Sequence, residues 1–183
     1  LKKKVINKKT CNFLIISELV KKKQILDLVK IFKKIYNEKF KFKLKIVGDG
    51  PEYDKINNYI LSNNIKRNIF LLGIRNKKEI TNLLDKTDYL ISCSKVETFG
   101  ITIAESIARG VPAIVLNSGG PNDFINSSNS YLVNNFEELE KKIINVIQKP
   151  KKFNRIKMNK FIYDRYSEKI LMKKFNKLIK KIK

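Results

Sequence analysis

Six short apolar segments recur along the chain, and each is nearly continuous rather than alternating with polar residues. The first reads "NFLIIS" and the fifth reads "PAIVLN". Short continuous apolar runs are typical of strands that are buried on both faces of a parallel sheet. We therefore predict strands at residues 12–17, 43–47, 68–73, 88–94, 112–117 and 130–133.

Amphipathic segments separate these strands. Between the first two, Ile25, Leu28, Val29 and Phe32 fall on one face of a helix. After the second strand, Pro51 stands at a helix start, where its missing N–H is tolerated best. The pattern predicts helices at residues 24–36, 51–61, 77–85, 100–109, 137–148 and 167–182.

The regular alternation of strands and helices indicates the α/β fold class. Because crossovers between parallel strands are right-handed, we expect helices on both faces of the sheet. We predict a Rossmann-like, doubly wound parallel sheet of about six strands, spanning residues 11–166. We interpret residues 1–10 as a linker remnant. Residues 167–183 are expected to form an amphipathic helix that packs on this domain or on an N-terminal domain outside the chain.

The chain carries a net charge of +23, from 40 lysines and arginines against 17 acidic residues. Such a charge is compatible with nucleic acid, an anionic membrane surface or an anionic small substrate. Arginine, the favoured tool for reading bases, is scarce, so we do not expect a nucleic-acid partner. The sequence contains no run of about 20 apolar residues, so no membrane span is predicted. Cys11 and Cys93 lack disulfide spacing, which fits the cytoplasm.

Ligands of doubly wound sheets bind at the carboxyl ends of the strands. After the fourth strand, "SKVETFGITIAES" places Glu97 before a helix that begins near Gly100, and Glu105 lies about 7 Å along its axis. Free N–H groups at a helix start suit a diphosphate, and a carboxylate on each side suits sugar hydroxyls. From these residues alone, a nucleotide-sugar site and an acidic cap followed by an ordinary glutamate both stay open.

The other strand ends are less specific. The three lysines at residues 21–23 are compatible with a phosphate-binding loop and equally with a solvent-exposed surface. The segment "VGDGPEY" has Tyr53 where a dinucleotide fingerprint needs its third glycine. Gly119 and Gly120 suit either an anion-binding nest or a plain turn. The sequence has no histidine and no D-x-D pair, so no metal site is predicted.

In this order, the segments resemble the carboxyl-terminal, donor-binding domain of family-4, group-1 glycosyltransferases of the GT-B fold. The resemblance covers nearly the whole chain, from "FLIISELVKKKQILDLVKIF" through "LKIVGDGPEYDKI" to the closing helix. Its central motif is E-x7-E, here Glu97 to Glu105, which gains specificity by following "DYLISCS" and preceding "ARGVPAIV". The resemblance implies one half of a GT-B fold.

The resemblance also implies roles for individual residues. Glu105 would hold the ribose of a UDP-linked or GDP-linked sugar, and Glu97 would face the transferred sugar. Lys23 would stabilise the departing diphosphate, which gives Glu97 and Lys23 catalytic roles. Further contacts with the donor would come from Phe99, Gly100, Ile101, Thr102 and, against the base, from the loop at Ile74 and Arg75.

One departure from the family concerns the diphosphate. Many members carry an arginine just after the first strand, where this chain has Glu18. A carboxylate cannot replace that cation. Either Lys21 or Lys22 compensates, or this chain works with less positive charge.

The resulting interpretation is the donor-binding part of a retaining, metal-independent glycosyltransferase that needs no cofactor. The acceptor, a glycan or lipid-linked molecule, would bind mainly to an N-terminal domain outside this chain, so the chain alone would be an incomplete enzyme. We expect a cytoplasmic location, with peripheral contact to an anionic membrane left open. The alternatives are a non-catalytic nucleotide-sugar-binding subunit and a basic α/β module that binds nucleic acid or membrane.

Overall fold

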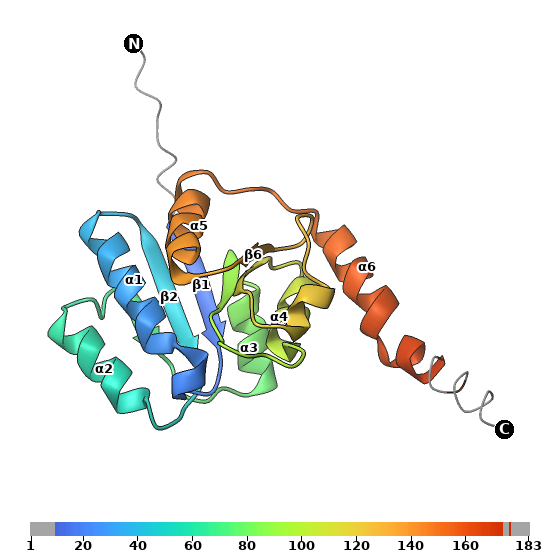
Figure 1. The fold of residues 1–183 in the computed structure, drawn as a ribbon, viewed down its shortest axis with the longest axis horizontal. Helices are drawn as coiled ribbons and strands as arrows, with labels where there is room; N and C mark the ends of the chain where they lie inside the picture. Colours follow the sequence, from blue (N-terminus) through green and yellow to red (C-terminus); the bar gives the residue numbers. More distant parts are fainter. Residues whose placement is uncertain (1–9, 174–175, 177–183) are drawn as a thin grey trace, which may run out of the picture.

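The computed structural model describes residues 10–173 and 176. Their strands form one parallel sheet with the order β3-β2-β1-β4-β5-β6. Figure 1 shows the fold coloured along the sequence. All six predicted strands are present, and they occur in the predicted order along the chain, which confirms the fold class. Their bounds are β1 (Cys11–Ile16), β2 (Phe42–Val47), β3 (Ile69–Leu71), β4 (Tyr89–Ser92), β5 (Ala113–Leu116) and β6 (Tyr131–Val133).

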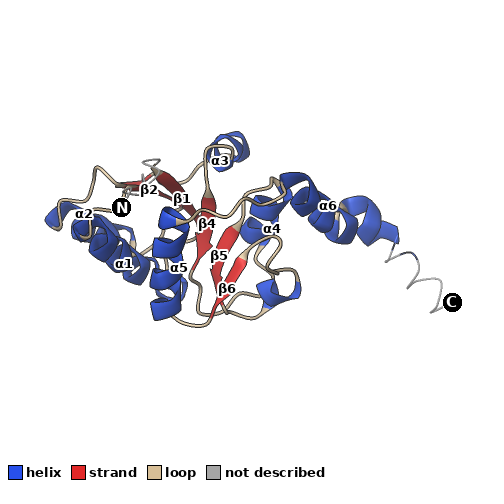
Figure 2. Ribbon diagram, turned by 90° about the horizontal axis from the view of Figure 1, so that it is seen from above, coloured by secondary structure: helices blue, strands red, loops and turns tan. Residues whose placement is uncertain are grey.

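Helices cover both faces of this sheet (Figure 2). Helices α1, α2 and α5 pack on one face against side chains such as Phe13. On the other face, α3 and α4 belong to the core around Leu14, and α6 joins that core by packing on α4. Neighbouring residues of one strand thus belong to different cores, which explains why the strands are continuously apolar. The helices are α1 (Ile25–Asn37), α2 (Tyr53–Ser62), α3 (Lys77–Leu84), α4 (Ile101–Ala108), α5 (Phe136–Gln148) and α6 (Arg155–Tyr166).

Helix α6 was not predicted from the sequence. It packs on α4, where it buries only Met158 and Ile162 along its length. Asn159 adds a hydrogen bond of 2.7 Å from its side-chain Nδ2 to the backbone oxygen of Ala108. Phe161 and Tyr166 are partly buried on the same face, but the exposed Ile156 and Tyr163 put apolar residues outside that face as well, so periodicity does not mark this helix.

The helix predicted at residues 167–182 falls only partly within the described residues. Residues 168–173 are helical after a bend at Ser167, and Leu171, assigned to its apolar face, is 48% exposed. Residues 174–175 and 177–183 lie outside the described residues, as do residues 1–9 of the predicted linker. The packing of this segment therefore stays a prediction.

The strand order places a topological switch between β1 and β4. From that point the chain winds outward through β2 and β3 on one side and through β5 and β6 on the other. The connections after β1 and β4 therefore leave the sheet side by side and in opposite directions, which opens a crevice at the carboxyl edge. Within the described part of the chain, no helix is long and apolar enough to cross a membrane.

The aromatic cluster beneath α1 gives a test of the fold. Phe32 is fully buried, with ring centroids 5.2 Å from Phe13 and 4.9 Å from Phe42. We predict that Phe32→Ala lowers the free energy of unfolding by about 3–5 kcal/mol, because it leaves a cavity in the core. Tyr36, one turn further along and 38% exposed, is the control, and Tyr36→Ala should cost less than about 1 kcal/mol. Equal losses in chemical denaturation would contradict this packing.

Candidate functional site

A cavity of about 330 Å³ lies at the carboxyl ends of β1 and β4. It is the crevice expected at the topological switch. Most of the residues that the sequence assigned to the donor line it together: Lys23, Glu97, Phe99, Gly100, Ile101 and Thr102. Glu18, the departure from the family pattern, lines the same cavity.

An ion pair joins the two sides of this cavity. The Nζ atom of Lys23 lies 2.6 Å from Oε2 of Glu97, and the two side chains are 18% and 21% exposed. The hydroxyl of Ser94 donates a longer hydrogen bond of 3.3 Å to the same carboxylate oxygen. The cation and the first acid of the E-x7-E motif therefore hold each other in this structure.

The loop after β1 is fastened to the end of β4. Lys23 closes a short 3-10 turn, η1 (Lys21–Lys23), and its backbone oxygen accepts a hydrogen bond of 3.2 Å from the Cys93 thiol. The backbone N–H of Lys95 donates to the oxygen of Lys22 at 2.9 Å. Burial raises the pKa of Cys93 to about 12, so its thiol stays protonated and able to donate at neutral pH. These contacts fix the position of the Lys23 backbone, from which its side chain extends.

Glu97 is fastened from the other side, by the loop after β5. It forms an isolated parallel bridge with Gly119, in which its N–H donates to the oxygen of Ser118 at 2.9 Å. Its own backbone oxygen accepts a hydrogen bond of 2.9 Å from the N–H of Gly120. The backbone of Glu97 is therefore fixed, although the residue lies in a loop.

Helix α4 begins at the cavity. Its N-cap, Gly100, has a left-handed backbone with φ 83° and no capping side chain, and the first turn contains no acidic residue. The first N–H groups of a helix, here those of Ile101 and Thr102, have no carbonyl partner within the helix. This end of α4 therefore presents hydrogen-bond donors and the positive end of the helix dipole to an anion.

Two assigned residues do not line the cavity. Glu105 is exposed on α4, beyond its first turn. Arg75 forms an ion pair with Glu79 at 3.6 Å and donates to the oxygen of Ile74 at 2.9 Å. Contacts of Glu105 with a ribose and of Arg75 with a base stay predictions.

Among the described residues, no second cation lines this cavity beside Lys23. Lys21 and Lys22 are exposed and do not line it, so neither stands in the cavity opposite Glu18. Among the described residues, no group of three or more histidines, cysteines and acids could hold a metal ion.

Several residues that position the site were not found from the sequence. Cys93 and the Gly119–Gly120 turn hold Lys23 and Glu97 through contacts between segments far apart in the chain, and Ser94 adds a local hydrogen bond to Glu97. The pair of glycines was noted as a turn, but nothing local indicated that it would clamp Glu97.

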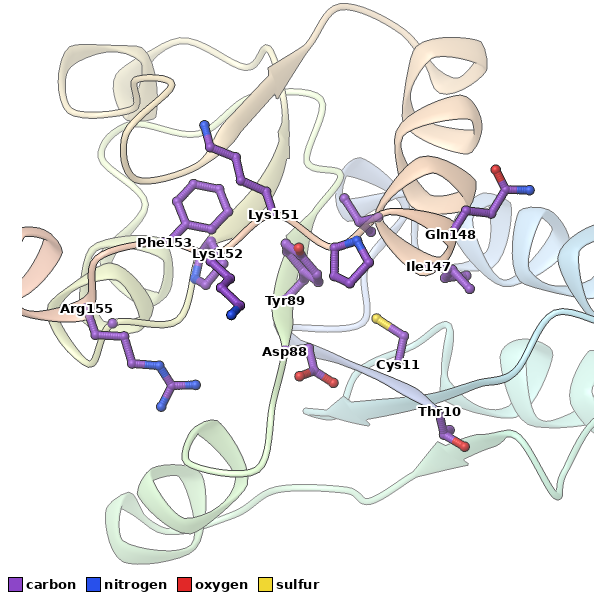
Figure 3. Close-up of a pocket in the computed structure, with 14 residues that line it drawn as sticks. Thr10, Cys11, Asp88, Tyr89, Ile147, Gln148, Lys151, Lys152, Phe153 and Arg155 are labelled. Atoms are coloured by element: carbon purple, nitrogen blue, oxygen red, sulfur yellow. The ribbon is translucent and has the colours of Figure 1, made fainter. Parts of the chain in front are cut away.

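A second cavity, of about 370 Å³, lies near the amino ends of β1 and β4 (Figure 3). Its charged groups include the carboxylate of Asp88, which accepts from the backbone N–H of Asn12 at 2.9 Å, and Lys151, which donates to the oxygen of Ser127 at 2.6 Å. Doubly wound sheets bind their ligands at the opposite edge. The cavity with Lys23 and Glu97 is therefore the better candidate.

Comparison with known proteins shows the family and the fold of this chain. The family model described as glycosyl transferases group 1 matches residues 1–180. This chain belongs to the group 1 glycosyltransferase family. It is 29% identical over 138 residues to the alpha-monoglucosyldiacylglycerol synthase of Acholeplasma laidlawii, a match that covers 75% of this chain and 35% of that protein.

Solved structures give the same fold. The apo lipopolysaccharide outer core galactosyltransferase WaaB superposes with a TM-score of 0.81 at 22% identity, over 96% of this chain and 50% of that one. Staphylococcus aureus TarM, in complex with fondaparinux, alpha-GlcNAc-glycerol and UDP, superposes with a TM-score of 0.77 at 26% identity, over 91% of this chain and 35% of that one. Our chain thus spans half or less of the length of these relatives, and it has the fold of one half of a GT-B enzyme.

The clamp on Glu97 can be tested at Gly120. A Cβ atom added there would lie 1.9 Å from the backbone oxygen of Thr98, which cannot move without the loop. We predict that Gly120→Ala lowers the free energy of unfolding by more than about 2 kcal/mol. Gly73→Ala is the control, since the added Cβ meets no atom within 4 Å and only the φ of +66° opposes it, at a cost of about 1 kcal/mol. Equal stability of the two variants in denaturant would refute the close contact.

Proposed function

We propose that this chain binds the donor of a retaining glycosyltransferase, a nucleoside diphosphate sugar. The observation that carries the proposal is the meeting of Lys23, Glu97 and the N-terminus of α4 in one cavity. A cation and free backbone donors suit a diphosphate, and a carboxylate beside them suits the hydroxyls of a sugar. The UDP held by the related TarM supports the same ligand class.

In this proposal the diphosphate lies against the free N–H groups of α4 and accepts from Lys23. Both are already in place before the bond to the sugar breaks, so they stabilise the negative charge that develops on the leaving group. Glu97 accepts hydrogen bonds from the transferred sugar, and Glu105, further along α4, accepts those of the ribose. Positive charge at the leaving group then comes from protein groups, so we propose that donor binding needs no metal.

The transfer itself is proposed to retain the anomeric configuration by attack on the same face from which the diphosphate departs. A double displacement needs a carboxylate placed as nucleophile. Glu97 is assigned to the hydroxyls of the transferred sugar, and Glu18 belongs to the loop that receives the diphosphate. We propose a glycan or lipid-linked acceptor held mainly by a second domain, in keeping with the lipid product in the name of the Acholeplasma relative.

The assignment of Glu105 gives a direct test. We predict that Glu105→Ala weakens binding of UDP-glucose or GDP-glucose about tenfold, because the ribose loses a charged acceptor. Binding is measured by calorimetric titration in excess EDTA, after thermal-shift screening of both nucleotides. Glu137→Ala, which removes an exposed acid from α5, should leave affinity unchanged.

Three outcomes would count against the proposal. Folded Glu105→Ala protein that binds as tightly as the parent would remove Glu105 from the site. Binding that disappears in EDTA would refute metal independence. Steeply salt-dependent binding of polyanions, with no nucleotide-sugar binding, would favour the basic module instead.

A further inference from the structure

We propose that Glu97 competes with the diphosphate for Lys23, so that the site favours the intact donor over the nucleoside diphosphate that remains after transfer. This inference rests on the proposed function and adds selectivity to it. It starts from the ion pair in the cavity, in which Lys23, the cation proposed to bind the diphosphate, is already paired with Glu97.

The cavity has no spare positive side chain. Among the described residues that line it, Lys23 is the only cation, whereas Glu18 and Glu97 are both acidic. At 2.6 Å and with about four-fifths of each side chain buried, the pair is shielded from water and is stronger than a surface ion pair. A diphosphate that enters must therefore draw Lys23 away from Glu97.

That exchange has a consequence for Glu97. Its backbone is held by Ser118 and Gly120, so the carboxylate stays near the anion after Lys23 has left. From the described residues it then keeps only the 3.3 Å hydrogen bond of Ser94. A partly buried carboxylate that loses its cation is destabilised unless new donors replace it. Within the described part of the chain, its second oxygen, Oε1, accepts no hydrogen bond and is open to a ligand.

An intact donor supplies what Glu97 has lost. The hydroxyls of the transferred sugar donate to the carboxylate while the diphosphate takes Lys23, so both partners of the former pair are satisfied. A nucleoside diphosphate without sugar takes Lys23 but gives Glu97 nothing. After transfer, Glu97 would therefore reclaim Lys23, which weakens the hold on the product and promotes its release.

The test compares each diphosphate with its sugar conjugate. Dissociation constants for UDP, UDP-glucose, GDP and GDP-glucose are measured by calorimetry on the whole 183-residue chain and on Glu97→Gln. Glutamine keeps the shape of the side chain but binds Lys23 weakly. We expect Glu97→Gln to tighten binding of the bare diphosphate about tenfold and that of the conjugate much less, so that the parent's preference for the conjugate shrinks.

Two further variants separate competition from simple charge repulsion. Glu18→Gln removes a negative charge from the same cavity without touching the pair, so it should shift both ligands equally and leave their ratio unchanged. In a Lys23→Ala background, Glu97→Gln should no longer tighten diphosphate binding, because there is no lysine to release.

The inference is overturned if Glu97→Gln fails to tighten diphosphate binding. It is also overturned if Glu18→Gln changes the ratio of the diphosphate and conjugate dissociation constants as much as Glu97→Gln does, or if Glu97→Gln still tightens diphosphate binding in the Lys23→Ala background. These results would leave nucleotide binding itself intact. Folded parent and variants that bind none of the four nucleotides would instead overturn the proposed function and this inference with it.

Discussion

The parallel pairing of β1 with β4 is the constraint on which the candidate site depends. Phe13 lies beside Tyr89 and Leu14 beside Leu90, although these residues are far apart in the chain. The pairing sets the loop with Lys23 next to the loop with Glu97, and the Cys93 thiol then ties the two together. Because the chain reverses its winding at this point, the loops diverge and leave a cavity rather than a packed surface.

The Lys23–Glu97 ion pair that spans this cavity adds little net stability to the fold, although the attraction within the pair is strong. Removing two charges from water costs about as much as their attraction returns, unless further hydrogen bonds satisfy both groups. Among the residues that the structure describes, only Ser94 supports the carboxylate in addition to Lys23. A pair with so little support, at the edge where ligands bind, is better explained by exchange with a ligand than by a structural role.

Local pattern was enough to predict the sheet, because strands buried on both faces read as continuous apolar runs wherever they stand in the chain. It failed for α6, where the exposed Ile156 and Tyr163 obscure the apolar face that includes Met158 and Ile162. The E-x7-E spacing placed Glu97 before a helix and Glu105 on it, and both places agree with the structure. The ion pair to Lys23 could not be predicted, since it depends on strand order and on a glycine clamp formed by another loop.

The charge of the chain and the charge of the cavity have opposite signs, and they act at different ranges. A net charge of +23 attracts any anion toward the molecule, whether nucleotide-sugar, spent nucleotide or phosphate. Attraction of that kind cannot select among them. Selection has to arise inside the cavity, where two acids and one lysine stand among the described residues that line it. An anion is held more tightly there if it also satisfies the carboxylate that loses Lys23, and a sugar with free hydroxyls meets that condition.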